Sequence, residues 1–501
     1  MTPIASRSGG ARGLECDALV FFGASGDLAY KQVFPALAAL AKRGVLRVPI
    51  IGVARSGWTA EQLVERARRS LEDHGTLDEP SFGQFAALLR FVDGDYADAA
   101  TFARLREELG AARRPLHYLA IPPELFETVV RALHASGAAD GARVVVEKPF
   151  GRDLASAQRL NRILREVFPE EAIFRIDHYL GKEPVKNLEY LRFANALFEP
   201  FWNRNYIRAV QITMAESFGV ETRGSFYETV GTIRDVVQNH MLQLVALLAM
   251  EPPAGQGYEP VRGAKAELLR AIRPLDARDV VRGQYVGYRD EPGVAAGSTV
   301  ETFAALKLQI DTWRWAGVPF LIRAGKKLAT TAAEVVVELQ SPPLDPFGER
   351  PHVRNNYARF QISPDIVIAL GLLAKQPGET MRGEEVELVL RSHPGDQLIA
   401  PYERLLEDAM RGDPELFARQ DTIEAAWRVL DPVLHDAAEP QNYEPGSWGP
   451  PSAERLATEI GGWLAPSPLC STPAAHEPTP GAEPPRTDSV QAEPRTEPVH
   501  V

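Results

Sequence analysis

The feature that most constrains the fold of this chain is a regular alternation of short apolar runs with amphipathic stretches over residues 17–176. The runs are rich in Val, Ile and Leu, which is typical of strands buried on both faces; they lie at residues 17–22, 48–53, 89–92, 116–121, 143–147 and 173–176. Between them lie stretches of helical periodicity, at residues 28–43, 60–72, 99–109, 124–135 and 153–167. Pro35 should kink the first of these. The alternation predicts an α/β domain whose parallel sheet carries helices on both faces.

The pattern changes after about residue 178. Strand-like runs then crowd together, several with alternating apolar and polar residues, at residues 209–214, 285–288, 300–310, 334–339, 358–362 and 386–390. One long helix is expected over residues 227–250. This second part predicts an α+β domain with a large, mainly antiparallel sheet. We therefore expect a flexible arm at 1–16, a first domain at 17–178, a second at 179–465 and a disordered tail rich in proline and acids at 466–501.

The composition excludes several classes of protein. Acidic residues outnumber basic ones by 67 to 55, for a net charge of −12, which argues against partners such as nucleic acid or an anionic membrane. No apolar run reaches the roughly 18 residues that span a bilayer, and the N-terminus lacks the apolar core of a secretory signal. The two cysteines, Cys16 and Cys470, cannot form a disulfide framework or a cysteine zinc site. We expect a soluble cytoplasmic protein with no metal site.

A glycine-rich turn joins the first strand to the first helix. Gly23, Gly26 and Ala29 fit the GxxGxxA variant of a dinucleotide-binding turn, in which the helix N-terminus presents amide donors to a diphosphate. The position of this turn within the alternating pattern strengthens the match. The expected cofactor-binding residues of the turn are Gly23, Ser25, Gly26, Asp27 and Leu28. The alternative is a tight strand-to-helix turn that simply needs small residues.

Arg55 follows the second strand. An NAD-binding domain usually has an acid at this position to hold the ribose hydroxyls, whereas an arginine suits the additional phosphate of NADP. Arg55 therefore favours NADP as the cofactor, and a surface arginine without a ligand is the alternative.

Two clusters of polar residues follow later strands. Lys148 comes directly after the run at 143–147, where a lysine at the carboxyl edge of a parallel sheet faces the crevice in which ligands bind. If a helix begins after residue 177, His178 and Lys182 share one of its faces. Together with Tyr179 they would offer donors and positive charge to a phosphate. A surface lysine and a solvated helix start are the alternatives.

A third cluster, residues 234–240, lies in the long predicted helix. His240 has apolar neighbours there, and a histidine in such a setting is commonly a core residue. However, oxidation of an alcohol requires a base for the hydroxyl proton, and a neutral imidazole suits that task. A carboxylate on the second ring nitrogen would fix the tautomer. Asp177 is a candidate for this carboxylate, although spacing alone does not place it near His240.

Taken together, these segments resemble the glucose-6-phosphate dehydrogenase family. The resemblance extends over about residues 17–465, and RIDHYLGKE is its most specific motif. The segments that carry it are FFGASGDLA at 21–29, VARS at 53–56, EKPFG at 147–151, RIDHYLGKEPV at 175–185 and RDVVQNHMLQ at 234–243, with further matches at 281–288, 301–308 and 318–328.

The resemblance assigns roles to individual residues. It implies that His240 is the general base and that Asp177 is its partner. It implies that the sugar phosphate is bound by His178, Tyr179 and Lys182. It implies that Lys148 contacts both substrate and cofactor, and that the other substrate-binding residues are Glu216, Asp235 and Lys326.

The resemblance also implies a fold and a reaction. The expected fold is an N-terminal Rossmann domain followed by a domain built on a large antiparallel sheet, assembled as a homodimer or homotetramer. The expected reaction converts D-glucose 6-phosphate and NADP⁺ to 6-phospho-D-glucono-1,5-lactone and NADPH, the first step of the oxidative pentose phosphate pathway.

Three positions depart from the family pattern. Gln32 and Thr331 stand where the family usually has cations that bind substrate, and Ser217 stands where proline is commoner. A charge-assisted hydrogen bond contributes about 1.5–3 kcal/mol, so losing two could weaken substrate binding roughly a hundredfold or more unless Lys31 or Lys327 compensates. Two alternatives therefore stay open: a dehydrogenase of another hexose 6-phosphate, and a catalytically silent NADP-binding paralogue.

Overall fold

The computed structural model describes residues 16–466, except 178, 345, 348–354, 364–365, 379–380, 392–398 and 436–437. The predicted arm and tail therefore lie outside the described residues, apart from Cys16 and Pro466. The described part contains two β-sheets, which belong to one compact unit that ends at Leu464. No helix in the described part is long and apolar enough to cross a membrane.

The first sheet has seven strands in the order β15-β6-β5-β4-β1-β2-β3. Six of them are parallel: β1 (Ala18–Phe22), β2 (Ile50–Ala54), β3 (Leu89–Asp93), β4 (Pro115–Leu119), β5 (Arg143–Val146) and β6 (Ile173–Ile176). The seventh, β15 (Phe417–Ala418), comes from the C-terminal part of the chain and pairs antiparallel with β6. The predicted parallel sheet is confirmed, because strands buried on both faces carry the apolar runs that the sequence shows.

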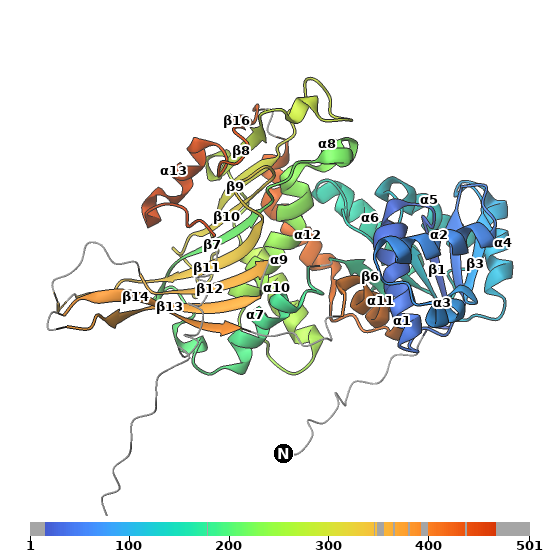
Figure 1. Cartoon of the computed structure of the whole chain (residues 1–501), viewed down its shortest axis with the longest axis horizontal. Coiled ribbons are helices and arrows are strands. Elements are labelled where there is room, and N and C mark those ends of the chain that lie inside the picture. The colour runs from blue at the N-terminus through green and yellow to red at the C-terminus, as the bar shows by residue number, and fades with distance from the viewer. Residues whose placement is uncertain are drawn as a thin grey trace, which may run out of the picture. The chain divides into compact units, whose positions relative to one another are not determined.

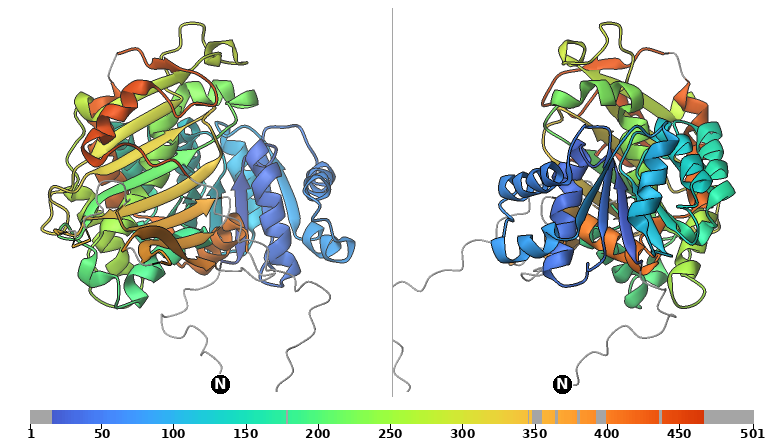
Figure 2. Two further views of the ribbon diagram at one scale, coloured as in Figure 1. Left: turned by 60° about the vertical axis from the view of Figure 1, so that its left-hand side comes forward. Right: turned by 90° about the vertical axis from the view of Figure 1, so that its right-hand side faces the viewer.

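Helices cover both faces of this sheet (Figure 2). One face carries α1 (Phe34–Lys42), α2 (Ala60–Asp73), α3 (Glu79–Ala86) and α11 (Pro401–Arg411). The other carries α4 (Ala99–Leu109), α5 (Phe126–Ala135), α6 (Leu154–Val167) and α12 (Gln420–Leu434). The first predicted helix is divided into a π-helical turn (Ala29–Val33) and α1. Pro35 directly follows this π-helical turn within a continuous helical stretch over residues 27–42, so its missing N–H falls where the hydrogen-bond pattern changes.

The second sheet has nine strands in the order β14-β13-β12-β11-β7-β10-β9-β8-β16 (Figure 1). Their bounds are β7 (Ile207–Ala215), β8 (Val280–Tyr285), β9 (Phe303–Leu308), β10 (Phe320–Gly325), β11 (Ala332–Leu339), β12 (Tyr357–Ser363), β13 (Val367–Lys375), β14 (Gly383–Arg391) and β16 (Gln441–Tyr443). All pairs are antiparallel except β7 with β10 and β8 with β16, so the predicted sheet type is confirmed. The strand predicted at 285–288 is wrong, because the chain turns at Gly287 (φ 93°) after β8 ends.

The main core of the second part lies between this sheet and a layer of helices. That layer contains α7 (Glu183–Ala194), α9 (Leu242–Ala249), α10 (Tyr258–Ala271) and α12. The opposite face of the sheet packs against α8 (Gly224–Thr232) and α13 (Glu454–Ala457). Helix α12 therefore packs in the cores of both sheets.

The single helix predicted over residues 227–250 is wrong. The chain forms α8, then a π-helical segment (Ile233–Met241), then α9. The break is at Gly231, which has a positive φ of 65°. A Cβ atom at this position would lie 2.6 Å from Oε1 of Glu301, the same atom that accepts a hydrogen bond from the N–H of Ile233 at 3.1 Å. Only glycine fits there, and the break sets the orientation of the segment that contains His240.

His117 makes the stability of the first sheet depend on pH. It is fully buried in β4, its Nε2 lies 2.8 Å from the carbonyl oxygen of Ala138, and burial lowers its pKa to about 4. In the unfolded chain this imidazole takes up a proton near pH 6.5, whereas in the folded chain it stays neutral down to about pH 4. The folded state is therefore at its full stability above pH 6.5 and loses stability as the pH falls. Between pH 7 and pH 5 the loss is about 2 kcal/mol. His117→Gln, which retains a donor but does not titrate, should reduce the fall in unfolding free energy by that amount in urea titrations. If the free energy of unfolding falls by the same amount between pH 7 and pH 5 in the variant and in the parent protein, His117 does not contribute.

Candidate active site

A cleft of about 1610 Å³ lies at the carboxyl ends of the parallel strands of the first sheet and extends to the second sheet. Most of the predicted site residues line it: Asp27, Leu28, Lys148, Tyr179, Lys182, Glu216, Asp235, His240 and Lys326. Gln32 and Thr331, two of the three positions that depart from the family pattern, line it as well. Residues separated by about 300 positions in the chain are therefore gathered around one cavity.

His240 and Asp177 form a buried pair. Nδ1 of His240 lies 2.7 Å from Oδ1 of Asp177, and the two residues are 4% and 2% exposed. The same carboxylate oxygen accepts the backbone N–H of Tyr179 at 3.0 Å. Asp177 directly follows β6, and His240 lies in the π-helical segment. The structure thus brings together two residues whose proximity the sequence spacing could not show.

Lys148 contacts the other side of the imidazole. Its Nζ lies 3.1 Å from Nε2 of His240 and 3.0 Å from Oδ1 of Asp235. Since an ammonium group only donates, Nε2 must be the acceptor, and the proton of the neutral ring then lies on Nδ1, facing Asp177. Nε2 therefore carries its single lone pair at the cleft, where in this structure it accepts a hydrogen bond from Lys148.

The pKa values of this group follow from burial and from Lys148. Burial lowers the pKa of His240 and the Lys148 ammonium lowers it further, while Asp177 opposes both. Burial alone would raise the pKa of Asp235, but the adjacent Lys148 more than offsets this and holds it below its ordinary value. At neutral pH the site therefore contains a neutral imidazole and an ionised Asp235.

Tyr179 and Lys182 lie beside this pair. The ring of Tyr179 stacks on that of His240, with centroids 4.4 Å apart, and Nζ of Lys182 lies 3.7 Å from the Tyr179 centroid. Residues 179–181 form a turn and Lys182 immediately precedes α7, so Lys182 does not lie within a helix as the shared-face argument required. His178 lies outside the described residues. The Lys182 ammonium and the Tyr179 ring nevertheless border the cleft together.

Glu216 and Lys326, which also line the cleft, form an ion pair. They follow the adjacent parallel strands β7 and β10, and Nζ of Lys326 lies 2.6 Å from Oε2 of Glu216. Next to them, the hydroxyls of Ser217 and Thr331 are 2.8 Å apart, and Thr331 also accepts the N–H of Ser217 at 3.0 Å. Two of the departures from the family pattern are therefore hydrogen-bonded to each other.

The glycine-rich turn has the backbone geometry that its sequence predicts. Gly23 has a φ of 84°, and a Cβ atom there would lie 2.1 Å from the carbonyl oxygen of Ala120. The N–H of Gly26 donates to the carbonyl of Gly23 at 2.9 Å, which closes the turn. Gly23, Ser25 and Gly26 are not among the residues that line the cleft, whereas Asp27 and Leu28, at the start of the following helix, are.

Arg55 lies just beyond the end of β2, and its side chain is 77% exposed. The guanidinium is 2.8 Å from a carboxylate oxygen of Asp95, and Arg55 does not line the cleft. A turn closed by Gly23 at the end of β1, with an exposed cation after the neighbouring β2, fits a dinucleotide that carries an additional phosphate.

Some cleft residues carry no local sequence signal. Arg223 and Tyr402 line the cleft but belong to none of the motifs. Tyr402, from α11, hydrogen-bonds to Glu147, which also accepts the Tyr118 hydroxyl at 2.5 Å; burial raises the pKa of Glu147 to about 7. Within the described residues, no group of three or more His, Cys, Asp or Glu side chains could hold a metal ion.

Comparison with known families gives matches along nearly the whole chain. The model described as the NAD binding domain of glucose-6-phosphate dehydrogenase matches residues 20–187. The model described as the C-terminal domain of glucose-6-phosphate dehydrogenase matches residues 189–463.

Individual relatives give the same result. Glucose-6-phosphate 1-dehydrogenase 1 from Mycobacterium tuberculosis (strain ATCC 25618 / H37Rv) is 45% identical over 90% of this chain and 96% of its own length. The crystal structure of glucose-6-phosphate 1-dehydrogenase from Mycobacterium avium is 45% identical, with a TM-score of 0.85 over 91% of this chain and 99% of that one. A glucose-6-phosphate dehydrogenase solved in complex with its substrate glucose 6-phosphate is 34% identical, with a TM-score of 0.83 over 91% and 100%. The chain belongs to the glucose-6-phosphate dehydrogenase family.

Proposed function

We propose that this chain is an NADP-dependent glucose-6-phosphate dehydrogenase, which oxidises D-glucose 6-phosphate to 6-phospho-D-glucono-1,5-lactone in the first step of the oxidative pentose phosphate pathway. The observation that carries this proposal is the buried chain of contacts Asp177–His240–Lys148 at the wall of the cleft. A base with an orienting carboxylate is what proton removal from an alcohol requires. A non-enzymatic paralogue would have no need of this arrangement.

In the proposed mechanism, Nε2 of His240 accepts the proton of the sugar C1 hydroxyl. Nδ1–H remains hydrogen-bonded to Asp177, whose negative charge stabilises the imidazolium that forms. NADP⁺, when bound, accepts the hydride that leaves C1. Lys148 occupies the lone pair of Nε2 before substrate binds, so its ammonium turns to a sugar oxygen when the C1 hydroxyl takes that place, and it can keep its hydrogen bond to Asp235. Burial of the pair excludes water, which strengthens each of these interactions.

The substrate is held by side chains that line the cleft. Lys182 and Tyr179, together with His178, bind the phosphate through charge and hydrogen bonds. The carboxylates of Glu216 and Asp235 accept hydrogen bonds from sugar hydroxyls, and Lys326 and Lys148 donate to sugar oxygens. These assignments are supported by the position of each described residue at the cleft.

The cofactor is held at the first sheet. The diphosphate binds the turn formed by Gly23, Ser25, Gly26, Asp27 and Leu28, where backbone amides at the start of the helix are available. Arg55 binds the additional phosphate of NADP, which requires it to exchange its exposed ion pair with Asp95 for the ligand. Lys148 contacts both cofactor and substrate.

We also propose an organisation for the whole molecule. Residues 17–178 bind cofactor, and residues 179–465 bind substrate and mediate assembly into a homodimer or homotetramer. The support for assembly is a group of exposed apolar side chains on two adjacent strands, β13 and β14: Leu372, Leu373, Leu388, Val389 and Leu390. The partner is a small sugar phosphate, with no nucleic acid or membrane partner, and the small number of cysteines suits a cytoplasmic location.

Replacement of His240 tests the base. His240→Asn should lower kcat about 10²–10⁴-fold, because the amide cannot accept the hydroxyl proton. Binding of NADPH, followed by its fluorescence, should be unchanged, since the turn at residues 23–28 is intact. Initial rates of NADPH formation at 340 nm with glucose 6-phosphate provide the measurement. Turnover at the level of the parent protein would exclude His240 as the base. A parent protein that binds NADPH yet reduces no NADP⁺ with any sugar phosphate would instead favour the silent paralogue.

Replacement of Gln32 tests the missing charge. Gln32 lines the cleft, so Gln32→Lys should add a charge-assisted hydrogen bond to the phosphorylated sugar and lower the KM for glucose 6-phosphate roughly tenfold. Gln32→Met, of similar length and without charge, is the matched control and should not lower it. An unchanged KM in the lysine variant would show that the position does not reach the substrate.

A second candidate function rests on Gln32 and Thr331, which stand where the family usually has cations; the hydroxyl of Thr331 is hydrogen-bonded to that of Ser217. The candidate is oxidation of another hexose 6-phosphate. A panel of glucose, galactose and mannose 6-phosphates decides between the two by kcat/KM. We expect the highest value with glucose 6-phosphate, and a higher value with another sugar would replace the first proposal.

A further inference from the structure

Helix α12 occupies an unusual position between the cores of the two sheets. Ile423 and Trp427 pack in the core of the first sheet, whereas Ala426 and Leu430 pack in that of the second. All four side chains are buried. A helix shared in this way can transmit the position of one sheet to residues supported by the other.

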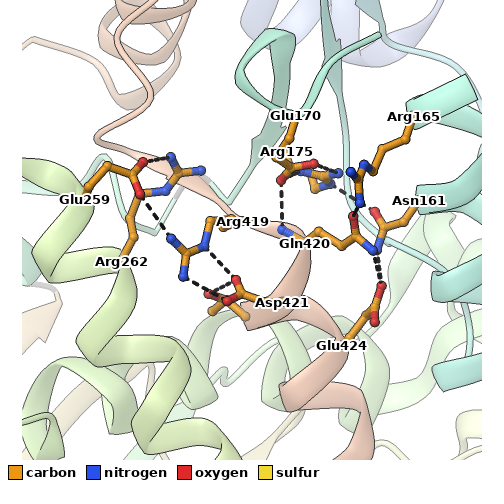
Figure 3. A network of polar contacts seen from close by, with 11 residues as sticks. Asn161, Arg165, Glu170, Arg175, Glu259, Arg262, Arg419, Gln420, Asp421 and Glu424 are labelled. Atoms are coloured by element: carbon orange, nitrogen blue, oxygen red, sulfur yellow. Dashed lines mark hydrogen bonds and ion pairs between the residues drawn. The ribbon is translucent and has the colours of Figure 1, made fainter. Parts of the chain in front are cut away.

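The start of α12 is fixed to β6 by a polar network (Figure 3). Glu170 pairs with Arg175 of β6 through two hydrogen bonds of 2.8 and 3.0 Å, and the same carboxylate accepts the N–H of Gln420 at 3.1 Å. Asn161 bridges Arg175, at 3.1 Å, to Glu424 of α12, at 3.0 Å. Because the side chain of Arg175 is 1% exposed, this attachment is shielded from solvent.

This attachment lies immediately beside Asp177. The strand that precedes α12, β15, pairs with β6 through Phe417 opposite Ile176 and Ala418 opposite Arg175. Asp177 is the next residue after β6. The start of α12 therefore holds the end of the strand from which Asp177 reaches His240.

The middle of α12 is fixed to the loop that follows Lys148. Nε1–H of Trp427 donates to the carbonyl oxygen of Phe150 at 2.8 Å, and Trp427 is fully buried. Asp431, one turn further along, accepts the N–H of Leu154 at 3.0 Å. Phe150 lies two residues after Lys148, so the indole determines where this loop leaves the sheet.

The end of α12 contacts the π-helical segment that contains His240. The guanidinium of Arg234 donates to the carbonyl of Arg152 at 2.8 Å and to that of Leu434, the last residue of α12, at 3.4 Å. Arg234 lies in the π-helical segment with Asp235 and His240. One helix thus contacts the supports of Asp177, Lys148 and His240.

We propose that Trp427 is a positioning residue for the reaction: its hydrogen bond to Phe150 holds Lys148 against Nε2 of His240. This proposal rests on the proposed function, because it concerns the protonation of the base. Trp427 touches neither substrate nor reacting atoms, and it acts through the loop at residues 148–151.

The consequence for His240 follows from the charges around it. Among the described residues, the groups that face the ring are Asp177 at the end of β6, Lys148 after β5, Asp235 on its own segment and the stacked Tyr179. Lys182 lies on the far side of Tyr179. Of these, Lys148 is the cation in contact with Nε2 and lowers the pKa of His240. If the loop relaxes and Lys148 moves away, that pKa rises.

The test compares two matched substitutions in the full chain. Trp427→Phe retains most of the buried area but removes the donor. Trp315→Phe does the same at a residue that is also buried and donates to a backbone carbonyl, that of Ala249, at 2.6 Å. Both should lose similar stability. Only Trp427→Phe should raise the apparent pKa of the acid limb of the kcat/KM profile, which reports the free enzyme, by about 0.5 or more, and lower kcat more than it changes KM.

Two results would overturn the proposal. One is an acid limb in Trp427→Phe that coincides with that of Trp315→Phe. The other is a change in KM alone. If Trp427→Phe does not fold, Asp431→Ala, at a half-buried position, removes the acceptor of the Leu154 N–H at the start of α6, which follows the loop at residues 148–151, and should move the acid limb in the same direction. An unmoved acid limb in this variant also contradicts the proposal. Because activity of the parent protein is measured first, failure of the proposed function is distinguished from failure of the positioning role.

Discussion

The chain of hydrogen bonds from Asp177 through His240 to Lys148 is the constraint on which the rest of the site depends. Each contact is 2.7–3.1 Å long, and the three residues come from three separate segments of the sequence. The pairing works only if the imidazole is neutral with its proton on Nδ1, since Lys148 can only donate. Burial and the ammonium favour this form, and the carboxylate selects the tautomer. Proton removal, substrate binding and the role proposed for helix α12 all depend on these three side chains keeping their contacts.

The ends of neighbouring strands bring these side chains together. Parallel strands deliver the residues that follow them to one edge of a sheet, so Lys148 after β5 and Asp177 after β6 are neighbours. The same arrangement occurs in the second sheet, where the parallel strands β7 and β10 place Glu216 beside Lys326 at their carboxyl ends. His240 arrives from a π-helical segment that begins after the break at Gly231. The cleft is where these two arrangements meet.

Much of this could be predicted from the sequence, because strands buried on both faces leave apolar runs and ligand-binding turns leave short motifs. Most of the residues that the motifs named line the cleft, whereas His178 lies outside the described residues and five others do not line it: Gly23, Ser25, Gly26, Arg55 and Asp177. The break at Gly231 could not be predicted, because it depends on Glu301, which is distant in sequence. The roles of Tyr402 and Trp427 were missed for the same reason: their partners Glu147 and Phe150 lie more than 250 residues away.

The most direct test of the account is the protonation state of His240 itself. In protein labelled with ¹⁵N at histidine, the resonances that disappear in His240→Asn identify this ring, and their shifts distinguish the two tautomers and the imidazolium. At pH 7.5 we predict a neutral ring with its proton on Nδ1 and none on Nε2, and a pKa below the ordinary histidine value of 6.5. A ring protonated on Nε2, or an imidazolium at that pH, would contradict it.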